Sequence, residues 1–140
     1  MLNQQVYNDF NGIKNRGRSF IVSYCKNLYN KLVNNLESVM GSAGGFFTAI
    51  RTACAIVACD GKLTVDEYNA FVEFSGSSCS YDEFYDTACG VSKDFAGAIN
   101  QIRSCGSDAV GITYALAIGV FALKGYLSSS EECFIENLLY

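Results

Sequence analysis

The sequence has 140 residues, half of them hydrophobic and 17% charged, which supports a folded domain with a substantial core and excludes a disordered chain. The net charge is −4, and because residues 1–40 carry a basic excess, the rest of the chain is distinctly acidic. An acidic body makes nucleic acid a poor partner. The chain has no histidine, and its seven cysteines show no Cys-X-X-Cys spacing, which excludes ordinary zinc sites and histidine-based catalysis.

The first forty residues predict two helices. Within residues 1–16, apolar residues recur at spacings of four and three until Gly17 interrupts the pattern. Residues 19–40 then carry a clear apolar stripe with helical spacing. We favour a helix whose stripe covers the core while its lysines are solvated. The alternative is a basic amphipathic helix that lies on an anionic membrane surface or on another protein.

A helix–turn–helix unit is predicted over residues 46–74. The stretch Gly41–Gly45 before it is typical of a short flexible link. The first helix of the unit is apolar on nearly every side, which is typical of a central helix. Gly61 ends that helix, because glycine adopts the left-handed conformation without a Cβ clash. Thr64 begins the next helix, and Glu67 three residues later completes a capping box.

Three further helices are predicted in the second half of the chain. Ser80–Glu83 forms another predicted capping box, which begins a short helix that we expect Gly90 to end. Residues 92–104 show helical spacing, and Ser107 can cap a long apolar helix. The apolar run of that helix is shorter than the roughly 20 residues that span a bilayer, so we expect a buried helix and no transmembrane segment. The N-terminus lacks the features of a secretory signal.

Residues 110–140 repeat the pattern of residues 46–74 at an offset of sixty-four. The break in the repeat is Asp60, whose counterpart is Lys124. The matched pairs are Ala53 and Ala117, Ile56 and Val120, Gly61 and Gly125, Leu63 and Leu127, Thr64 and Ser128, and Glu67 and Glu131. We interpret the repeat as a degenerate internal duplication.

These patterns predict one all-α domain over residues 1–140, a compact bundle of about seven helices. Residues 1–40 form an N-terminal helical segment in this prediction. The duplicated units, residues 46–74 and 110–140, form two pseudo-symmetric helix–turn–helix halves that pack face to face around one core, because two copies are too few for a solenoid.

The turn of the first unit invites comparison with an EF-hand calcium loop. If Gly61 is placed at position six, Asp60 falls at position five and Glu67 at position twelve, where an EF-hand has its bidentate glutamate. Positions one and three then fall on Ile56 and Ala58, which cannot bind a cation. A true EF-hand is therefore excluded, and only part of its ligand set remains, namely Asp60 and Glu67.

The surviving carboxylates still predict a site for a divalent cation such as Ca²⁺. Asp60 and Glu67 can converge, because helical side chains lean toward the helix N-terminus. Two carboxylates do not complete the shell of a hard cation, and Asp66 or Glu131 could supply further oxygens. Two other interpretations stay open. Asp60 and Glu67 serve only the loop and the capping box, or Lys124 pairs with them and an ammonium replaces the cation.

The pattern from Ala53 to Glu67, with its echo from Lys124 to Glu131, resembles the tellurite-resistance TerB-like family. The resemblance runs from about Ser19 to the C-terminus. It implies a compact all-helical fold of two related halves and an acidic surface with proposed divalent-metal binding. It also implies a role in tellurite resistance and related chemical-stress responses, exercised beside membrane-associated partners and without catalysis.

The resemblance can be followed residue by residue. Lys124 departs from the family pattern, where an Asp is usual, and this departure weakens a two-sided metal site. The positions that match are Asp60, Gly61 and Glu67 in the first motif and Gly125 and Glu131 in the second.

We therefore expect a non-enzymatic stress-response scaffold that binds protein partners and a divalent metal. The alternative is a metal-independent protein–protein interaction domain. An enzyme is disfavoured, because the chain does not cluster the acid–base or nucleophilic groups that catalysis needs. Seven cysteines without a disulfide framework indicate a reducing compartment, so we expect a cytoplasmic protein, and the resemblance places it beside the inner face of the membrane.

Overall fold

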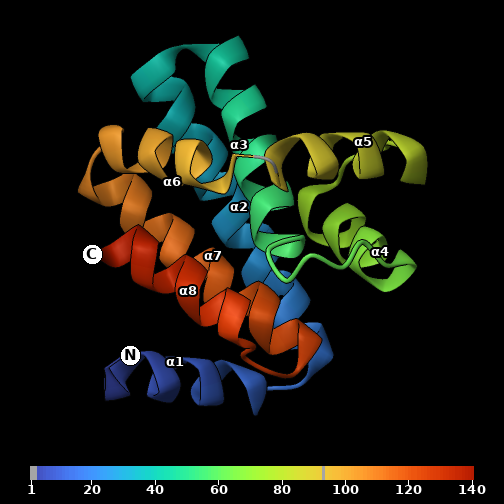
Figure 1. Cartoon of the computed structure of the whole chain (residues 1–140), viewed down its shortest axis with the longest axis vertical. Coiled ribbons are helices and arrows are strands. Elements are labelled where there is room, and N and C mark those ends of the chain that lie inside the picture. Colours follow the sequence, from blue (N-terminus) through green and yellow to red (C-terminus); the bar gives the residue numbers. More distant parts are fainter. Residues whose placement is uncertain (1–2, 93) are drawn as a thin grey trace.

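The computed structural model describes residues 3–92 and 94–140, and every regular element within these ranges is an α-helix. The all-α prediction is confirmed, and the predicted number of about seven helices is one too low. In chain order the eight helices are α1 (Gln4–Lys14), α2 (Arg18–Met40), α3 (Ser42–Val57), α4 (Val65–Ser75), α5 (Tyr81–Ser92), α6 (Phe95–Ser104), α7 (Ser107–Lys124) and α8 (Ser129–Leu139) (Figure 1). Residues 1, 2 and 93 lie outside the described part, so the helices expected over residues 1–16 and 92–104 are compared over the remaining residues.

Three helices, α2, α3 and α7, form the centre of the bundle. The most extensive helix–helix packing is that of α2 against α3 and α7. Both α3 and α7 are buried over much of their length, as their apolar sequences predict. The apolar stripe of α2 also faces the core, whereas Lys26 and Lys31 are exposed. The favoured interpretation of this stripe, a core-facing helix with solvated lysines, is therefore confirmed.

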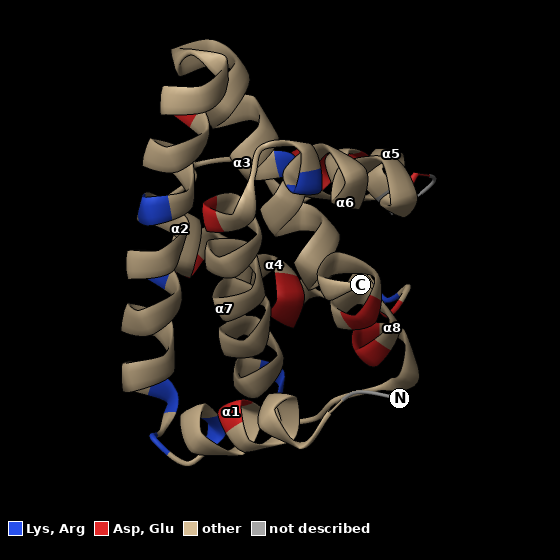
Figure 2. Cartoon of the chain, turned by 90° about the vertical axis from the view of Figure 1, so that its left-hand side faces the viewer, with Lys and Arg blue, Asp and Glu red and all other residues tan. Residues whose placement is uncertain are grey.

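The remaining helices cover this centre. The first, α1, lies across one end of α7, and α8 packs against α7 and α6 (Figures 1 and 2). Two phenols attach α1 to its neighbours: Tyr114 donates to Asp9 Oδ2 at 2.6 Å, and Tyr7 donates to Glu132 Oε1 at 2.9 Å. Helices α4, α5 and α6 all contact α3, and α4 also contacts α2. This arrangement brings the α3–α4 turn and the α7–α8 turn to the same side of the core.

The expected flexible link at Gly41–Gly45 is wrong, because α3 already begins at Ser42. Only Gly41, with φ of +87°, interrupts the helices. Gly45 lies in tight contact with α2, where a Cβ atom would come within 2.3 Å of the Glu37 backbone nitrogen. The glycines of this stretch therefore permit close approach of two helices, and tertiary packing overrides the low helix propensity of glycine.

The expected end of the fifth helix at Gly90 is also wrong, since α5 continues to Ser92. A glycine inside a helix costs only about 1 kcal/mol relative to alanine. Val91, one residue further on, is buried in the core, and Ala88 before the glycine is fully buried. Burial of Val91 gives the helix a reason to continue through Gly90.

Among the described residues, α7 is the one helix long and apolar enough to cross a membrane by length and composition. Its 18-residue window has a mean hydropathy of 1.3, and half of that window is buried inside the protein. The core helix of a globular domain meets the same criterion. In this structure α7 packs against α1, α2 and α8.

Candidate functional site

Two helix–turn–helix corners with the same local design face one another. In the first corner, between α3 and α4, Gly61 takes a φ of +78°, and Thr64 and Glu67 form the predicted capping box. In the second corner, between α7 and α8, Gly125 takes a φ of +96°, and Ser128 and Glu131 form the corresponding box. Both boxes were expected from the sequence, and both are confirmed by reciprocal hydrogen bonds.

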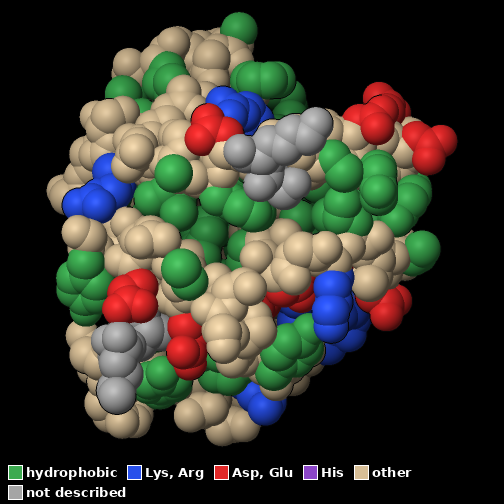
Figure 3. All heavy atoms as spheres, in the orientation of Figure 1, with side chains coloured by type: hydrophobic (Ala, Val, Ile, Leu, Met, Phe, Trp, Pro, Cys, Tyr) green, Lys and Arg blue, Asp and Glu red, His purple; other side chains and the backbone are tan. Residues whose placement is uncertain are grey.

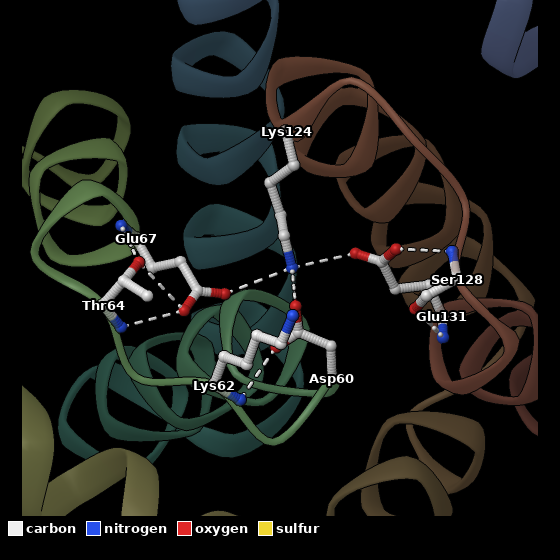
Figure 4. A network of polar contacts seen from close by, with 7 residues as sticks. All are labelled: Asp60, Lys62, Thr64, Glu67, Lys124, Ser128 and Glu131. Carbon is white, nitrogen blue, oxygen red and sulfur yellow. Dashed lines mark hydrogen bonds and ion pairs between the residues drawn. The ribbon is translucent and has the colours of Figure 1, made fainter.

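Three carboxylates from the two corners surround the ammonium group of Lys124 (Figure 4). Each carboxylate uses one oxygen for a backbone N–H and the other for the ammonium. The backbone donors are Lys62 to Asp60 Oδ1 at 3.0 Å, Thr64 to Glu67 Oε1 at 3.0 Å and Ser128 to Glu131 Oε1 at 2.8 Å. The distances from Lys124 Nζ are 2.9 Å to Asp60 Oδ2, 3.1 Å to Glu67 Oε2 and 2.9 Å to Glu131 Oε2.

The different partners of the two oxygens in Glu67 and Glu131 follow from the capping boxes. A glutamate at the third helical position must turn back to reach the backbone N–H of its cap residue. Once Oε1 is held there, Oε2 of Glu67 and of Glu131 is directed beyond the helix end, toward the space between the corners. Lys124, in the last turn of α7, extends its side chain into that space. The local helix-start signals therefore orient the ion cluster.

The ion cluster is withdrawn from solvent. The side chain of Lys124 is 11% exposed, those of Asp60 and Glu67 are 6% exposed, and that of Glu131 is fully buried. Three carboxylates around one ammonium leave an excess of negative charge. The positive ends of the α4 and α8 dipoles partly offset this excess, because Glu67 and Glu131 lie in the first turns of those helices.

Opposing effects act on the pKa values of the cluster, and the charge partners prevail. Burial alone would lower the pKa of Lys124, but its contacts with Asp60, Glu131 and Glu67 raise that pKa above its ordinary value, so the ammonium is retained. Burial alone would raise the pKa of Asp60. Hydrogen bonds from Lys124 and from the Lys62 backbone, together with both lysine charges, lower it instead.

The dimensions of the cluster fit an ammonium group. Calcium–oxygen distances are about 2.3–2.6 Å and magnesium–oxygen distances about 2.0–2.1 Å, whereas the three oxygens lie 2.9–3.1 Å from Lys124 Nζ. Over residues 3–92 and 94–140, no group of three or more His, Cys, Asp and Glu side chains is arranged to hold a metal ion. These contacts therefore agree with the interpretation in which the Lys124 ammonium takes the place of a metal cation.

The structure brings together three of the four residues predicted for the metal site. Asp60, Glu67 and Glu131 all contact Lys124. Asp66 is exposed on the first turn of α4 and stands outside the cluster. The reason is positional: the third residue of a capped helix turns back over the cap, and the second residue does not.

A pocket of about 670 Å³ opens beside the ion cluster. Asp60, Glu67 and Lys124 form one wall of it, and Asp66 lies at its rim. Apolar side chains of α3, α4 and α7 also line it, namely Val57, Ala70, Val72, Val120 and Leu123. The lining also contains more charged than aliphatic residues, so the pocket is a mixed, predominantly polar surface with a small apolar component.

Sequence reasoning missed two of the residues that line this pocket. Arg18, at the start of α2, donates to Glu73 of α4 at 2.9 Å, and both line the pocket. These residues are 55 positions apart, and no motif connects them. Their pairing depends on how α4 packs against α2, which periodicity along the chain does not reveal.

Two buried cysteines and one half-buried cysteine lack the properties of a catalytic nucleophile. Burial raises the pKa of Cys25, Cys54 and Cys59 to about 12, so these thiols stay protonated at neutral pH. None of the seven cysteines, all within the described part of the chain, is in a disulfide. Cys59 lies directly beside the ion cluster in sequence, where the negative charge of Glu131 further disfavours the thiolate.

No protein-family model, curated protein or solved structure matches this chain. The resemblance to the TerB-like family therefore rests on the residues quoted above, and the functions that it implies stay predictions.

Proposed function

We propose that this protein is a metal-independent, non-catalytic binding domain that recognises a protein partner through the pocket beside Lys124. The single observation that carries the proposal is the position of the Lys124 ammonium, which contacts three carboxylates from both corners. Because the cluster holds its own cation, the pocket needs no metal to keep these carboxylates together. The pocket wall is thereby preorganised for a ligand.

The lining of the pocket indicates the kind of segment that it would accept. Among its apolar residues, Val72 and Leu123 are half-buried and offer a small surface for one hydrophobic side chain, and the lining carries charges of both signs. Arg18 pairs with Glu73, and Lys62 and Asp66 also line the pocket. A polypeptide segment with an apolar side chain flanked by charged residues matches this pattern.

We further propose that the two corners descend from one duplicated unit and form pseudo-symmetric halves. The support is their shared local design, with a left-handed glycine and a capping box at matching positions. Asp60 and Lys124 occupy corresponding positions and contact each other at 2.9 Å. In this proposal, the duplicated position has taken opposite charges in the two copies.

The metal-responsive scaffold implied by the TerB-like resemblance is distinguished by a calcium titration. Thermal unfolding should keep the same midpoint in EDTA and in millimolar Ca²⁺, since the ammonium already neutralises the cluster. Backbone amide signals of Gly61 and Glu67 should also stay in place. A midpoint that rises by several degrees with saturable dependence on Ca²⁺ would support the metal-binding function and contradict the proposal.

The partner-binding claim is tested by two matched charge reversals, Asp66→Lys and Asp82→Lys. Both residues are exposed and occupy the second position of a helix that begins with a Ser/Thr–Glu capping box, so both substitutions should affect stability alike. Asp66 lines the pocket, and Asp82 is not among its lining residues.

Partners captured by the wild-type protein should be identified by mass spectrometry, purified and titrated directly. We expect Asp66→Lys to weaken binding about tenfold or more, and Asp82→Lys to leave it within about twofold, as for a charge outside the interface. Equal affinity for both variants would show that the partner docks elsewhere.

A further inference from the structure

The end of the molecule formed by the α2–α3 turn exposes four large apolar side chains, which we call the α2–α3 tip. Val39 and Phe46 are each 52% exposed, Met40 is 37% exposed and Phe47 is 61% exposed. The tip lies at one extreme of the molecule and is built from the end of α2 and the start of α3 (Figure 1). Single exposed apolar residues are common, but four exposed apolar side chains together at one end indicate an interaction surface.

No charged residue occurs between Glu37 and Arg51, so the tip is uncharged as well as apolar. Figure 3 shows this end covered by hydrophobic and neutral side chains, with charged groups appearing only below it. In the side view of Figure 2, the turn between α2 and α3 shows no basic or acidic residue. An aqueous protein partner would usually be recognised with some polar or charged contacts at the rim.

The tip stands on closely packed helical backbone. The backbone of α3 approaches that of α2 so closely at Gly45 that a Cβ atom would meet Glu37 at 2.3 Å. Thr48 and Ala49, directly after the two phenylalanines, are buried. Phe46 and Phe47 therefore project from a fixed backbone, and their exposure is not the result of a loose loop.

The exposed area is too small for a stable interface with a second copy of the chain. Two half-exposed phenylalanines present roughly 100 Å² each, and all four side chains together present a few hundred Å². A specific protein–protein interface buries about 800 Å² on each partner. A lipid surface has no such requirement, because the bilayer interface adapts its shape around an inserted apolar wedge.

The charge next to the tip complements an anionic surface. From Ser23 to Ser38, the solvent-facing side of α2 carries Lys26 and Lys31 against one acidic residue, the half-buried Glu37, and its other exposed residues are neutral: Ser23, Asn27, Asn30, Asn34 and Ser38. Figure 2 shows basic residues along the outer edge of this helix. Anionic headgroups attract lysines that come near the membrane surface.

We propose that the α2–α3 tip docks the protein onto the surface of an anionic lipid bilayer. Phe46, Phe47, Met40 and Val39 enter the boundary between headgroups and acyl chains, and Lys26 and Lys31 attract the anionic headgroups. This surface is separate from the pocket beside Lys124, so a protein held on lipid can still present the pocket to its partner. The inference is independent of the proposed partner binding.

The test is co-sedimentation of the full-length protein with two kinds of vesicle, one of phosphatidylcholine and one in which about a third of the lipid is phosphatidylserine. The wild type should bind both, and the anionic vesicles about tenfold more strongly. The variant Phe46→Ser/Phe47→Ser should lose at least about tenfold in binding to both. The variant Lys26→Gln/Lys31→Gln should lose the preference for phosphatidylserine alone.

A matched control is Val65→Ser/Tyr140→Ser, which removes two equally exposed apolar side chains distant from the tip. It should bind vesicles as the wild type does. Unchanged urea unfolding midpoints in all three variants show that they are folded, which is expected for exposed positions. The chain lacks tryptophan, so Phe47→Trp introduces a single indole, whose emission should shift to shorter wavelength with vesicles; Tyr140→Trp should not shift.

Three outcomes would overturn the proposal. The first is a wild-type protein that binds neither vesicle. The second is a tip variant that binds as strongly as the wild type, which would place the lipid contact elsewhere. The third is a concentration-dependent dimer in sedimentation velocity that disappears in Phe46→Ser/Phe47→Ser, which would make a second copy the occupant of the tip.

Discussion

The two helix–turn–helix corners share a backbone design and carry opposite charges at the position just before the glycine. Each has an apolar helix, a left-handed glycine and a capping box whose glutamate points into the space between the corners. At the position just before the glycine, the first corner has Asp60 and the second has Lys124. This difference in charge lets the second corner supply the cation that contacts the carboxylates of both corners.

The comparison shows how a charge at one position can replace an external ligand. Two identical acidic corners would bring together four carboxylates, which repel one another unless a cation is bound. With Lys124, the cation is covalently part of the chain and costs no binding entropy. The corners are then held together by an internal ion cluster at all metal concentrations.

Removing the ammonium group of Lys124 should have the largest effect on the stability of the protein. In Lys124→Met, three carboxylates lose their common cation while the aliphatic part of the side chain is kept. We expect a loss of about 3–5 kcal/mol in the free energy of unfolding, as for a buried ion pair with one partner removed. Urea denaturation followed by circular dichroism measures it. Lys62→Met, at an exposed position of the same turn, is the control and should change stability by less than about 0.5 kcal/mol.

A loss below about 1 kcal/mol in Lys124→Met would mean that the carboxylates do not depend on the ammonium, and the cluster would then be incidental.

The two capping glutamates should differ in their importance. Glu131 is fully buried and Glu67 keeps a small exposed fraction, so water can partly replace the contacts of Glu67. We expect Glu131→Ala to cost about 2–3 kcal/mol and Glu67→Ala about 1 kcal/mol less, by urea denaturation. Glu83→Ala removes an exposed capping glutamate that lies outside the cluster and should cost the least. Equal costs for Glu131 and Glu83 would reduce the cluster to ordinary helix capping.

The sequence predicts those features of the fold and of the ion cluster whose signals lie close together along the chain. The capping glutamates and the glycine turns are visible within a few residues, and all were predicted. Lys124 was recognised as one alternative, because it breaks the repeat at Asp60. The helical start at Ser42 was missed, since it depends on the contact between Gly45 and α2. The pairing of Arg18 with α4 was missed for the same reason: only tertiary packing brings them together.

Exchanging the two charges tests whether the corners are equivalent. Each single variant, Asp60→Lys or Lys124→Asp, places like charges together and should be strongly destabilised. The double variant Asp60→Lys/Lys124→Asp restores an opposite-charge pair with the direction reversed. We expect a favourable coupling energy of about 2 kcal/mol in a double-mutant cycle, within the usual range for contacting residues. Additive losses would contradict the proposed pseudo-symmetry of the two corners.

The stability of the protein should depend on pH in both the acidic and the alkaline range, because the cluster contains carboxylates and an ammonium group. The pKa of Asp60 in the folded state lies below its ordinary value of 3.8, so its contribution is present above pH 3.8 and is lost as pH falls through the folded-state pKa. The pKa of Lys124 is raised above 10.5, so its contribution is present below pH 10.5 and declines as pH rises toward the folded-state pKa. In Asp60→Asn, urea midpoints should fall less between neutral and acidic pH than in the wild type. Parallel pH profiles would contradict this assignment.

The central claim is that Lys124 occupies the place of a cation between the two corners. An anomalous-scattering map of wild-type crystals soaked in terbium, which replaces calcium in oxygen-rich sites, tests it most directly. We expect no anomalous peak among Asp60, Glu67 and Glu131, with the ammonium still between their oxygens. A strong peak at that point, with the Lys124 side chain displaced, would contradict it.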